Sequence, residues 1–322
     1  MDQLPLTGTS DCEMLIVDGK HALWRSADAF SDLSIKSGDS EQKTGAIYGF
    51  LAIAVRAWRR FGGMVVVAWD DWEEGPAFRR SIFPGYKRRA PADAVKSEML
   101  ETMARQQQRL IQLLGTLGIR QVVSPQWEAD DVIAALCAAA ERTESATVIL
   151  SGDRDLLQLV SARTRLARPA KGGQFIVETP ETILAEWGCE PRHILDIKAL
   201  AGDPGDCIPG ARGIGPKTAI KLLSEHGWSW ERVLAWAAIA EPSSSRVIQS
   251  LRENRHQVTI SSRLVRLNDT CPLRWLPVER DQKAVIQSLF QLKFRSLLQG
   301  GKTGDLLAMG GSSDSTGATS HE

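Results

Sequence analysis

The sequence predicts an α/β fold in which a twisted, mainly parallel sheet is flanked by helices and followed by a largely helical region. Short apolar, β-branched runs alternate with helix-period segments over the first half of the chain. From Thr179 onward the apolar spacing is helical, and Pro180 and Pro191 stand near the starts of two helices. The 322 residues suffice for one large domain or two modest ones.

Each expected strand is a short apolar run, and each expected helix carries apolar residues at helical spacing. The strands are expected at residues 14–17, 64–69, 120–123, 147–150, 164–167 and 174–177. The helices are expected at residues 44–61, 93–117, 132–141, 180–187, 191–202, 219–225 and 285–298. Residues 1–11 are expected to be flexible, and the Gly/Ser/Thr-rich residues 300–322 to be disordered.

Acidic residues stand where several of these strands end or where the next helix begins. They are Asp18, Asp70, Glu128, Asp130, Asp131, Asp153 and Asp155. The carboxyl ends of parallel strands face one crevice, so these side chains are expected to converge. Carboxylates this close repel one another unless cations lie between them. The pattern therefore predicts a site for hard divalent metals such as Mg²⁺ or Mn²⁺.

Each acidic cluster also has a structural interpretation. Asp130 can cap a helix and Asp131 can complement its dipole, while Asp153 and Asp155 can belong to a turn. The recurrence of acids at the ends of separate strands favours the metal site.

Two further acids, Asp203 and Asp206, lie in a turn of the helical half. After them, residues 210–218 contain Gly213-Ile214-Gly215, with Lys217 and Thr218 at the start of a helix. Backbone N–H groups and the helix dipole at such a turn can bind a phosphate without reading bases.

A basic stretch follows the second strand. Its cations are Arg79, Arg80, Lys87, Arg88 and Arg89, and its aromatic residues are Phe78, Phe83 and Tyr86. One interpretation is a solvated loop. The other is a phosphate-binding patch with rings for base stacking, which the position beside the Asp70 strand end favours.

Overall charge does not decide between these interpretations. Basic and acidic residues number 39 each, and setting aside the nine candidate metal carboxylates leaves an excess of nine basic residues.

Five scattered cysteines without a CxxC pair argue against a disulfide framework or a zinc site. The odd number and scatter of these cysteines fit reduced thiols in a cytoplasmic protein. No run of 18 apolar residues and no signal pattern is present, so no membrane contact is expected.

The order and spacing of these motifs resemble the 5′-nuclease or flap endonuclease family. The nearest likeness is to the 5′–3′ exonuclease domain of bacterial DNA polymerase I and its stand-alone bacterial or phage relatives. The matching segments are residues 17–19, 44–49, 78–87, 128–133, 151–155 and 202–217. The resemblance runs from Leu15 to Leu298 and ends where a polymerase portion would begin, so a stand-alone nuclease is expected.

The resemblance implies a PIN-like nuclease domain at residues 12–178 with a helical arch near 78–110. It also implies a helix–two-turn–helix DNA-binding domain at residues 179–299. The expected substrate is DNA with 5′ ends, flaps or nicks, with RNA primers as a further possibility, and the protein is expected to be monomeric.

The resemblance also assigns roles to residues. Those implied for a first metal ion are Asp18, Asp70, Glu128, Asp130 and Asp131, and those for a second are Asp153, Asp155, Asp203 and Asp206. Arg79 and Lys87 match basic residues beside the scissile phosphate, and Tyr86 matches their aromatic neighbour. The turn at Gly213-Ile214-Gly215 matches the segment that holds the duplex backbone and a K⁺ ion.

Three positions depart from the family pattern. Ala90 stands where an arginine is usual, Cys207 where an asparagine commonly follows the last acid, and Trp24 where a tyrosine is common. None of the three removes an expected metal ligand.

Two rival functions compete with the nuclease. A metal phosphatase with an Asp nucleophile usually needs a second Asp two residues after Asp18, where this chain has Lys20. A non-catalytic, structure-specific DNA-binding protein would not need all nine carboxylates, which this chain retains.

Overall fold

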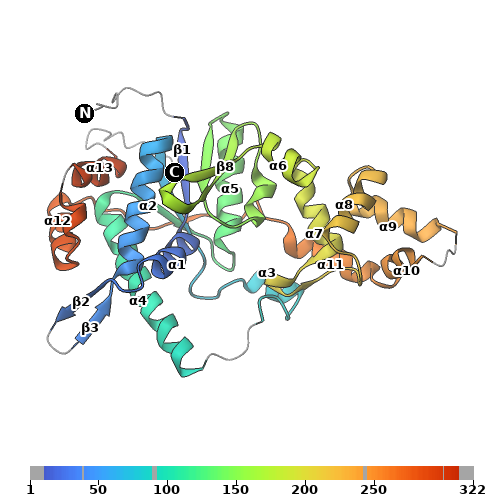
Figure 1. Cartoon of the computed structure of the whole chain (residues 1–322), viewed down its shortest axis with the longest axis horizontal. Helices are drawn as coiled ribbons and strands as arrows, with labels where there is room; N and C mark the ends of the chain where they lie inside the picture. The colour runs from blue at the N-terminus through green and yellow to red at the C-terminus, as the bar shows by residue number, and fades with distance from the viewer. Residues whose placement is uncertain (1–10, 38–39, 89–92, 242–244, 300, 312–322) are drawn as a thin grey trace, which may run out of the picture.

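The computed structural model, drawn in Figure 1, describes residues 11–37, 40–88, 93–241, 245–299 and 301–311. An α/β part holds the N-terminal half of the chain, and a helical arm extends from it to the right of the view. The expectation of a flexible segment at residues 1–11 falls, except for Asp11, outside the described residues.

A seven-stranded sheet forms the centre of the α/β part, in the order β11-β5-β4-β1-β6-β7-β8. Its strands are β1 (Met14–Asp18), β4 (Met64–Trp69), β5 (Arg120–Val123), β6 (Thr147–Leu150), β7 (Thr164–Pro169), β8 (Phe175–Glu178) and β11 (Arg274–Trp275). The pairs from β5 to β7 are parallel, and β8 and β11 add antiparallel edges. The predicted mainly parallel sheet is confirmed.

Strand β1 lies at the centre of the sheet because both of its faces are apolar. Ile16 aligns with Val66 of β4 and with Ile149 of β6. Leu15 and Val17 pack on one face of the sheet and Ile16 on the other, as the alternation of a strand requires. Because β1, β4 and β6 run in the same direction, the residues that follow them emerge at one edge of the sheet.

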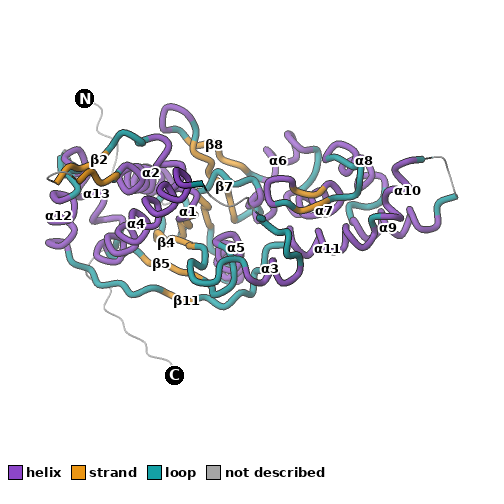
Figure 2. Tube along the Cα trace, turned by 90° about the horizontal axis from the view of Figure 1, so that it is seen from below, coloured by secondary structure: helices purple, strands orange, loops and turns teal. Residues whose placement is uncertain are grey.

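Helices cover both faces of this sheet (Figures 1 and 2). The helices of the α/β part are α1 (Gly19–Ala29), α2 (Gly45–Phe61), α3 (Ala77–Ile82), α4 (Ala94–Leu117) and α5 (Ala129–Arg142). The apolar cluster that contains Leu15 and Val17 is built mainly from α1, α2 and α4, whereas α5 packs on the Ile16 face. A short hairpin of β2 (Ser34–Ser37) and β3 (Ser40–Lys43), which the sequence analysis did not anticipate, precedes α2.

The helical arm carries the helices expected at 180–187, 191–202 and 219–225 with changes of boundary, and three further helices that were not predicted individually. Its helices are α6 (Pro180–Trp187), α7 (Ile194–Ala201), α8 (Pro216–Glu225), α9 (Trp230–Ile239), α10 (Arg246–Glu253) and α11 (Arg255–Val265). The helix expected at 191–202 is a 3₁₀ turn, η3 (Pro191–His193), followed by α7. A two-residue pair, β9 (Gly202–Asp203) and β10 (Ile208–Pro209), with the turn η4 (Pro204–Asp206) between its strands, separates α7 from α8.

Two expectations for the C-terminal region are wrong. The helix expected at 285–298 is α12 (Gln282–Gln291) and a separate 3₁₀ turn, η5 (Arg295–Leu297), because Lys293 between them adopts a left-handed conformation with φ 55°. Residues 300–322 are not wholly disordered, since they contain α13 (Lys302–Met309).

Helix α13 forms because it has apolar surface to bury against the α/β part. Leu306 is fully buried and Met309 is 4% exposed, and both belong to the cluster that includes α2. Figure 1 shows α12 and α13 beside α2 and α4, so the C-terminal region returns to the first half of the chain. Within the described ranges, none of the helices combines the length and apolar character that spanning a membrane requires.

We expect Leu306→Ala to lower the free energy of unfolding by about 2–5 kcal/mol, because it leaves a cavity in the main core. Urea unfolding followed by far-UV circular dichroism measures the change. The matched control is Ile239→Ala, whose side chain is 86% exposed and whose substitution should cost less than about 0.5 kcal/mol. Equal effects of the two substitutions would show that α13 does not contribute to the core.

Candidate functional site

A cavity of about 460 Å³ opens at the edge of the sheet where β1, β4 and β6 end. We call it the carboxylate cavity. Its acidic lining residues are Asp18, Asp70, Glu128, Asp130, Asp153 and Asp206, and its basic ones are Lys20 and Lys87. The structure therefore brings six of the nine predicted metal ligands to one cavity.

Asp130 is the residue in this cavity whose charge is least compensated. Burial, and then the neighbouring Asp153 and Asp18, raise its pKa well above the ordinary value. Within the described residues, no hydrogen bond or ion pair reaches its side chain. A half-buried carboxylate among other carboxylates, without a donor of its own, fits the oxygen ligand set of a hard divalent cation.

Asp18 and Asp70 are held by neighbouring groups at the ends of their strands. Asp18 accepts hydrogen bonds from the Ser151 hydroxyl at 2.7 Å and from the His21 N–H at 3.0 Å, while burial raises its pKa. Asp70 accepts from the Ala129 N–H at 2.9 Å and pairs with Lys20. Burial acts to raise the pKa of Asp70, but Lys20, the Ala129 N–H and Lys87 together outweigh it and leave this pKa below the ordinary value.

Lysines act as counter-ions for the remaining acids. Lys87 Nζ lies 2.6 Å from Glu128 Oε1 and 3.4 Å from Asp206 Oδ2. Lys198 of α7 bridges Asp155 and Asp203, with 2.6 Å between its Nζ and Asp203 Oδ2. Asp155 and Asp203 thus lie outside the lining of the carboxylate cavity, held by a lysine that the sequence analysis missed.

These ammonium groups occupy the spaces between carboxylates. As arranged in the structure, no group of three or more acidic, histidine or cysteine side chains within the described ranges is placed to hold one metal ion. The acidic side chains nonetheless offer only oxygen donors. Their negative charge already attracts cations, because the ammonium groups of Lys20, Lys87 and Lys198 pair with them. The chemistry of the residues therefore fits divalent cations.

Arg79 does not lie where the resemblance implied, because its guanidinium is buried and bonded to protein. It binds both carboxylate oxygens of Asp131, at 2.8 Å for the longer contact, and Glu128 Oε2 at 3.1 Å. It also donates to the carbonyl oxygens of Leu264 at 2.9 Å and Arg266 at 3.2 Å. Arg79 cannot contact a substrate phosphate directly, because its N–H groups are bonded to these acceptors and the residue is only 3% exposed.

The expectation that Asp131 binds the first metal ion also does not fit. Besides Arg79, its carboxylate accepts the Glu128 N–H at 3.2 Å and the Asn268 N–H at 2.9 Å, and it is fully buried. With Glu128 it forms the capping box of α5, so the helix cap that was considered for Asp130 is made by Glu128 and Asp131 instead. The lone pairs that a metal ion would need are taken.

Tyr86 is a hydrogen-bond donor to the acids and not an exposed ring. Its hydroxyl lies 2.6 Å from Glu128 Oε2 and 3.2 Å from Asp206 Oδ2, and burial raises its pKa further above the ordinary value. The side chain is 3% exposed. Contrary to expectation, the Tyr86 ring therefore has no free face on which a base could stack.

The residues expected to bind DNA fall into two groups. Arg80 and Arg88 are exposed, whereas Arg89 and Ala90 lie outside the described residues. Cys207 is exposed, with φ 58°, and its thiol donates to the Arg88 carbonyl at 3.7 Å. Trp24 lines the carboxylate cavity.

The second group lies at the start of α8. Gly213 has φ +78°, which favours glycine, and a Cβ added at Gly213 or Gly215 would meet nothing within 4 Å. Lys217 is exposed and Thr218 half-buried, but Ile214 is 4% exposed and packs in the core of the arm. Ile214 thus anchors the turn, and its side chain does not face solvent.

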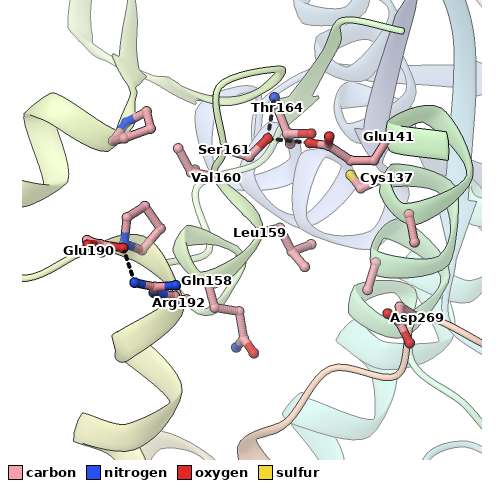
Figure 3. A pocket seen from close by; sticks show the side chains of 14 residues that line it. Cys137, Glu141, Gln158, Leu159, Val160, Ser161, Thr164, Glu190, Arg192 and Asp269 are labelled. Atoms are coloured by element: carbon pink, nitrogen blue, oxygen red, sulfur yellow. Dashed lines mark hydrogen bonds and ion pairs between the residues drawn. The ribbon is translucent and has the colours of Figure 1, made fainter. Parts of the chain in front are cut away.

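A larger cavity of about 520 Å³, shown in Figure 3, has no such set of groups. Much of its lining is apolar and includes Cys137, Leu159 and Val160. Its acids, Glu141, Glu190 and Asp269, lie apart from one another, and Glu190 is paired with Arg192 at 2.9 Å. Volume alone therefore does not locate the candidate site.

Comparison with known families agrees with the site. Residues 13–188 match the model of the 5′–3′ exonuclease N-terminal, resolvase-like domain, and residues 189–285 match that of the 5′–3′ exonuclease C-terminal SAM fold. The chain belongs to the 5′–3′ exonuclease family. The predicted fold class and the resemblance are both confirmed.

Individual relatives of this exonuclease-family chain are DNA polymerases. The thermostable DNA polymerase I of Thermus thermophilus is 34% identical over 289 residues, which is 88% of this chain and 32% of that protein. DNA polymerase I of Bacillus subtilis is 31% identical over 296 residues, 89% of this chain and 32% of that protein. The chain spans about a third of the length of these relatives.

Solved structures share the fold. T5 5′-exonuclease with bound divalent metal ions (zinc) has a TM-score of 0.67 and 17% identity, over 92% of this chain and 99% of that one. Flap endonuclease-1 of Methanococcus jannaschii has a TM-score of 0.52 and 17% identity, over 93% of each chain. At these identities the likeness establishes the fold alone.

We expect Arg79→Leu to lower the free energy of unfolding by roughly 3–5 kcal/mol, because it leaves the carboxylate of Asp131 buried without its cation. Urea unfolding of the metal-free protein measures the change. Arg79→Leu combined with Asp131→Leu should recover part of the loss. Arg263→Leu, on the exposed side of α11, is the matched control, and a loss as large as that of Arg79→Leu would contradict the assignment.

A second prediction concerns Asp130 and pH. Its pKa in the folded protein lies above the 3.8 of the free side chain, so the folded state binds this proton more tightly than the unfolded state. Ionisation of Asp130 therefore lowers the free energy of unfolding of the metal-free protein as the pH rises above 3.8. Asp130→Asn should melt at a higher temperature than wild type in EDTA at neutral pH and should lose this part of the pH dependence. An unchanged melting profile would contradict it.

Proposed function

We propose that this chain is a structure-specific 5′ nuclease that hydrolyses DNA phosphodiesters, both as a 5′–3′ exonuclease and as a flap endonuclease, in replication or repair. Membership of the 5′–3′ exonuclease family supports this function. The observation that carries the chemical step is the carboxylate cavity, in which six acids meet at one sheet edge and the charge of Asp130 is the least compensated.

The acids would hold two Mg²⁺ or Mn²⁺ ions in two groups. The first group is Asp18, Asp70, Glu128 and Asp130, and the second is Asp153, Asp155, Asp203 and Asp206. When bound, such cations supply charge neutralisation at the phosphate and a water of lowered pKa. T5 5′-exonuclease, which shares the fold, has been solved with divalent metal ions.

Lys87 is the residue that we propose stabilises the scissile phosphate. Its side chain lines the carboxylate cavity, and its backbone has φ 48°, an uncommon conformation for a residue with a side chain. The Lys87 N–H donates to the Asp206 carbonyl at 2.9 Å, which holds this conformation in place. A cation positioned before substrate binds offsets the charge that develops on the phosphate during hydrolysis.

Tyr86 and Arg79 would act indirectly, by positioning the Glu128 carboxylate that Lys87 also binds. Both donate to Glu128 Oε2, at 2.6 Å and 3.1 Å, while Lys87 binds Oε1. These donors restrict the orientation of the Glu128 carboxylate before any cation binds. Arg79 is thus proposed as a positioning residue and not as a direct phosphate ligand.

The turn at Gly213-Ile214-Gly215 would bind the backbone of duplex DNA. Gly215 caps α8 without a side-chain hydrogen bond, and Pro216 follows it, so the first N–H groups of the helix face outward. The free space beside Gly213 and Gly215 lets a phosphate approach the main chain. Lys217, Arg80 and Arg88 would add charge attraction, and a K⁺ ion could be held by the carbonyl groups of the turn.

The partner we propose is DNA with a 5′ end, flap or nick, and RNA primers are a further candidate substrate. T5 flap endonuclease and the catalytic core of Rad2, which share the fold, have been solved in complex with DNA. We further propose that the protein acts as a cytoplasmic monomer.

A labelled 5′-flap duplex tests the proposal directly. The wild-type protein and Asp153→Asn are incubated with flaps of DNA or RNA in Mg²⁺, Mn²⁺ or EDTA, and fragments are sized by gel electrophoresis. We expect metal-dependent release of the flap by wild type alone, with retained DNA binding by Asp153→Asn. Intact DNA in every lane, together with flap binding, would mean that this family member binds DNA without cutting it.

A further inference from the structure

A second cavity, of about 320 Å³, adjoins the carboxylate cavity on the side of α3. We call it the tryptophan pocket. The two cavities share Lys20, Asp70, Lys87 and Glu128. The residues that line the tryptophan pocket alone are Asp71, Trp72, Gly75, Pro76, Arg80, Gln107 and Trp127. A group in this pocket would therefore lie directly beside the proposed reaction centre.

The walls of the tryptophan pocket are aromatic. Trp72 is 47% exposed, although large aromatic side chains are usually covered in a monomeric fold. Trp127 is half-buried and is stacked on Phe78, with 4.2 Å between the ring centroids and 28° between their planes. The packing against Phe78 holds the Trp127 ring in place, and Trp72 offers a flat apolar surface to the pocket.

Asp71 holds the loop that carries Trp72. Its buried carboxylate accepts the N–H groups of Gln126 at 2.7 Å and Glu73 at 3.0 Å. The Asp71 N–H in turn donates to the Trp127 carbonyl at 3.3 Å. These bonds tie the Trp72 loop to the Trp127 loop without a ligand, so the pocket is formed in advance and loses little entropy on binding.

Two polar side chains at this pocket have no partner in the described part of the chain. The Arg80 guanidinium and the Gln107 amide line the pocket, and neither takes part in a hydrogen bond or ion pair among described residues. An amide offers two donors and an acceptor, which suits the edge of a nucleobase, and an arginine can bind a phosphate or stack on a ring. The volume falls within the range usual for small-ligand sites.

The charge of the pocket lining favours a base over a second phosphate as the group that binds in the pocket. The pocket lining contains three basic residues and three acidic ones, so it has no net attraction for an anion. Its distinguishing features are an exposed indole and a free amide. Stacking on an aromatic ring contributes to binding of unpaired bases regardless of their identity.

We propose that the tryptophan pocket binds the unpaired base of a nucleotide whose phosphate lies in the carboxylate cavity. The base stacks on Trp72, Gln107 bonds its edge, and Arg80 reaches the adjoining phosphate. This inference rests on the proposed nuclease function. The ligand is a base joined to a phosphate, supplied either by the strand being cut or by a mononucleotide released from it.

The test compares Trp72→Ala with Trp72→Phe, and Trp275→Ala is the matched control because Trp275 is 46% exposed and lies outside the pocket lining. Flap substrates carry a single abasic site at successive positions around the cleavage point. For Trp72→Ala we expect the KM to rise roughly 5- to 100-fold with kcat unchanged, as loss of one stacked base predicts. Trp72→Phe should recover most of this loss.

The abasic substrates locate the base. In wild type, one abasic position should raise the KM to the value of Trp72→Ala, and in Trp72→Ala the same position should add nothing further. Inhibition of wild type by free dAMP, absent for Trp72→Ala, would identify a released mononucleotide as a ligand. Lack of such inhibition, with the abasic effect present, would identify the base of the strand.

A binding measurement separates failure of this inference from failure of the nuclease function. Fluorescence of 2-aminopurine at the located position is recorded in EDTA, where stacking on Trp72 should quench it in wild type and not in Trp72→Ala. Quenching without cleavage would support the pocket and overturn the nuclease function. Cleavage with equal KM and equal fluorescence for Trp72→Ala and Trp275→Ala would overturn the pocket alone.

Discussion

The contact between Arg79 and Asp131 is the interaction on which the geometry of the site depends. It joins α3, the start of α5 and the carbonyl groups at the end of α11, so it connects the α/β part of the chain to the helical arm. The cost of burying a carboxylate and a guanidinium is offset when their donors and acceptors are bonded, and here each N–H of Arg79 and both oxygens of Asp131 have partners. Because the same guanidinium bonds Glu128, the packing of the arm sets the orientation of an acid in the carboxylate cavity.

The second constraint is repulsion among the acids. The sheet delivers more negative charge to one edge than neutral packing can compensate, and the fold places lysines from separate elements between the acids. The compensation is incomplete at Asp130, whose pKa is raised by burial and by Asp153 and Asp18. A site that keeps a half-buried, incompletely compensated carboxylate loses stability in the absence of cations, and this is a frequent property of sites selected for chemistry.

An element can be predicted from the sequence where its structure follows from its own segment. Strand β1 and the strands beside it were predicted because β-branched runs bounded by polar residues have few alternatives. Helix α13 was not predicted, because it forms only where α2 offers a surface for Leu306 to cover. Strand β11, a two-residue strand, was not predicted either, because it exists only where β5 has a free edge to pair with. Isolated short segments carry no periodic signal that would reveal such contacts.

The sequence by itself determined the parallel sheet, the convergence of acids at one edge and membership of the nuclease family, because these depend on local patterns and on the fixed direction of parallel strands. Only the tertiary structure decided which of these carboxylates are bonded to protein groups and which face the cavity. Asp130 and Asp131 are adjacent in sequence, yet one faces a cavity of like charges and the other is bonded to Arg79 and Asn268. Neighbouring residues of a helix point about 100° apart, so the partners that arrive from α3 and the α11 region reach one of the two carboxylates and not the other.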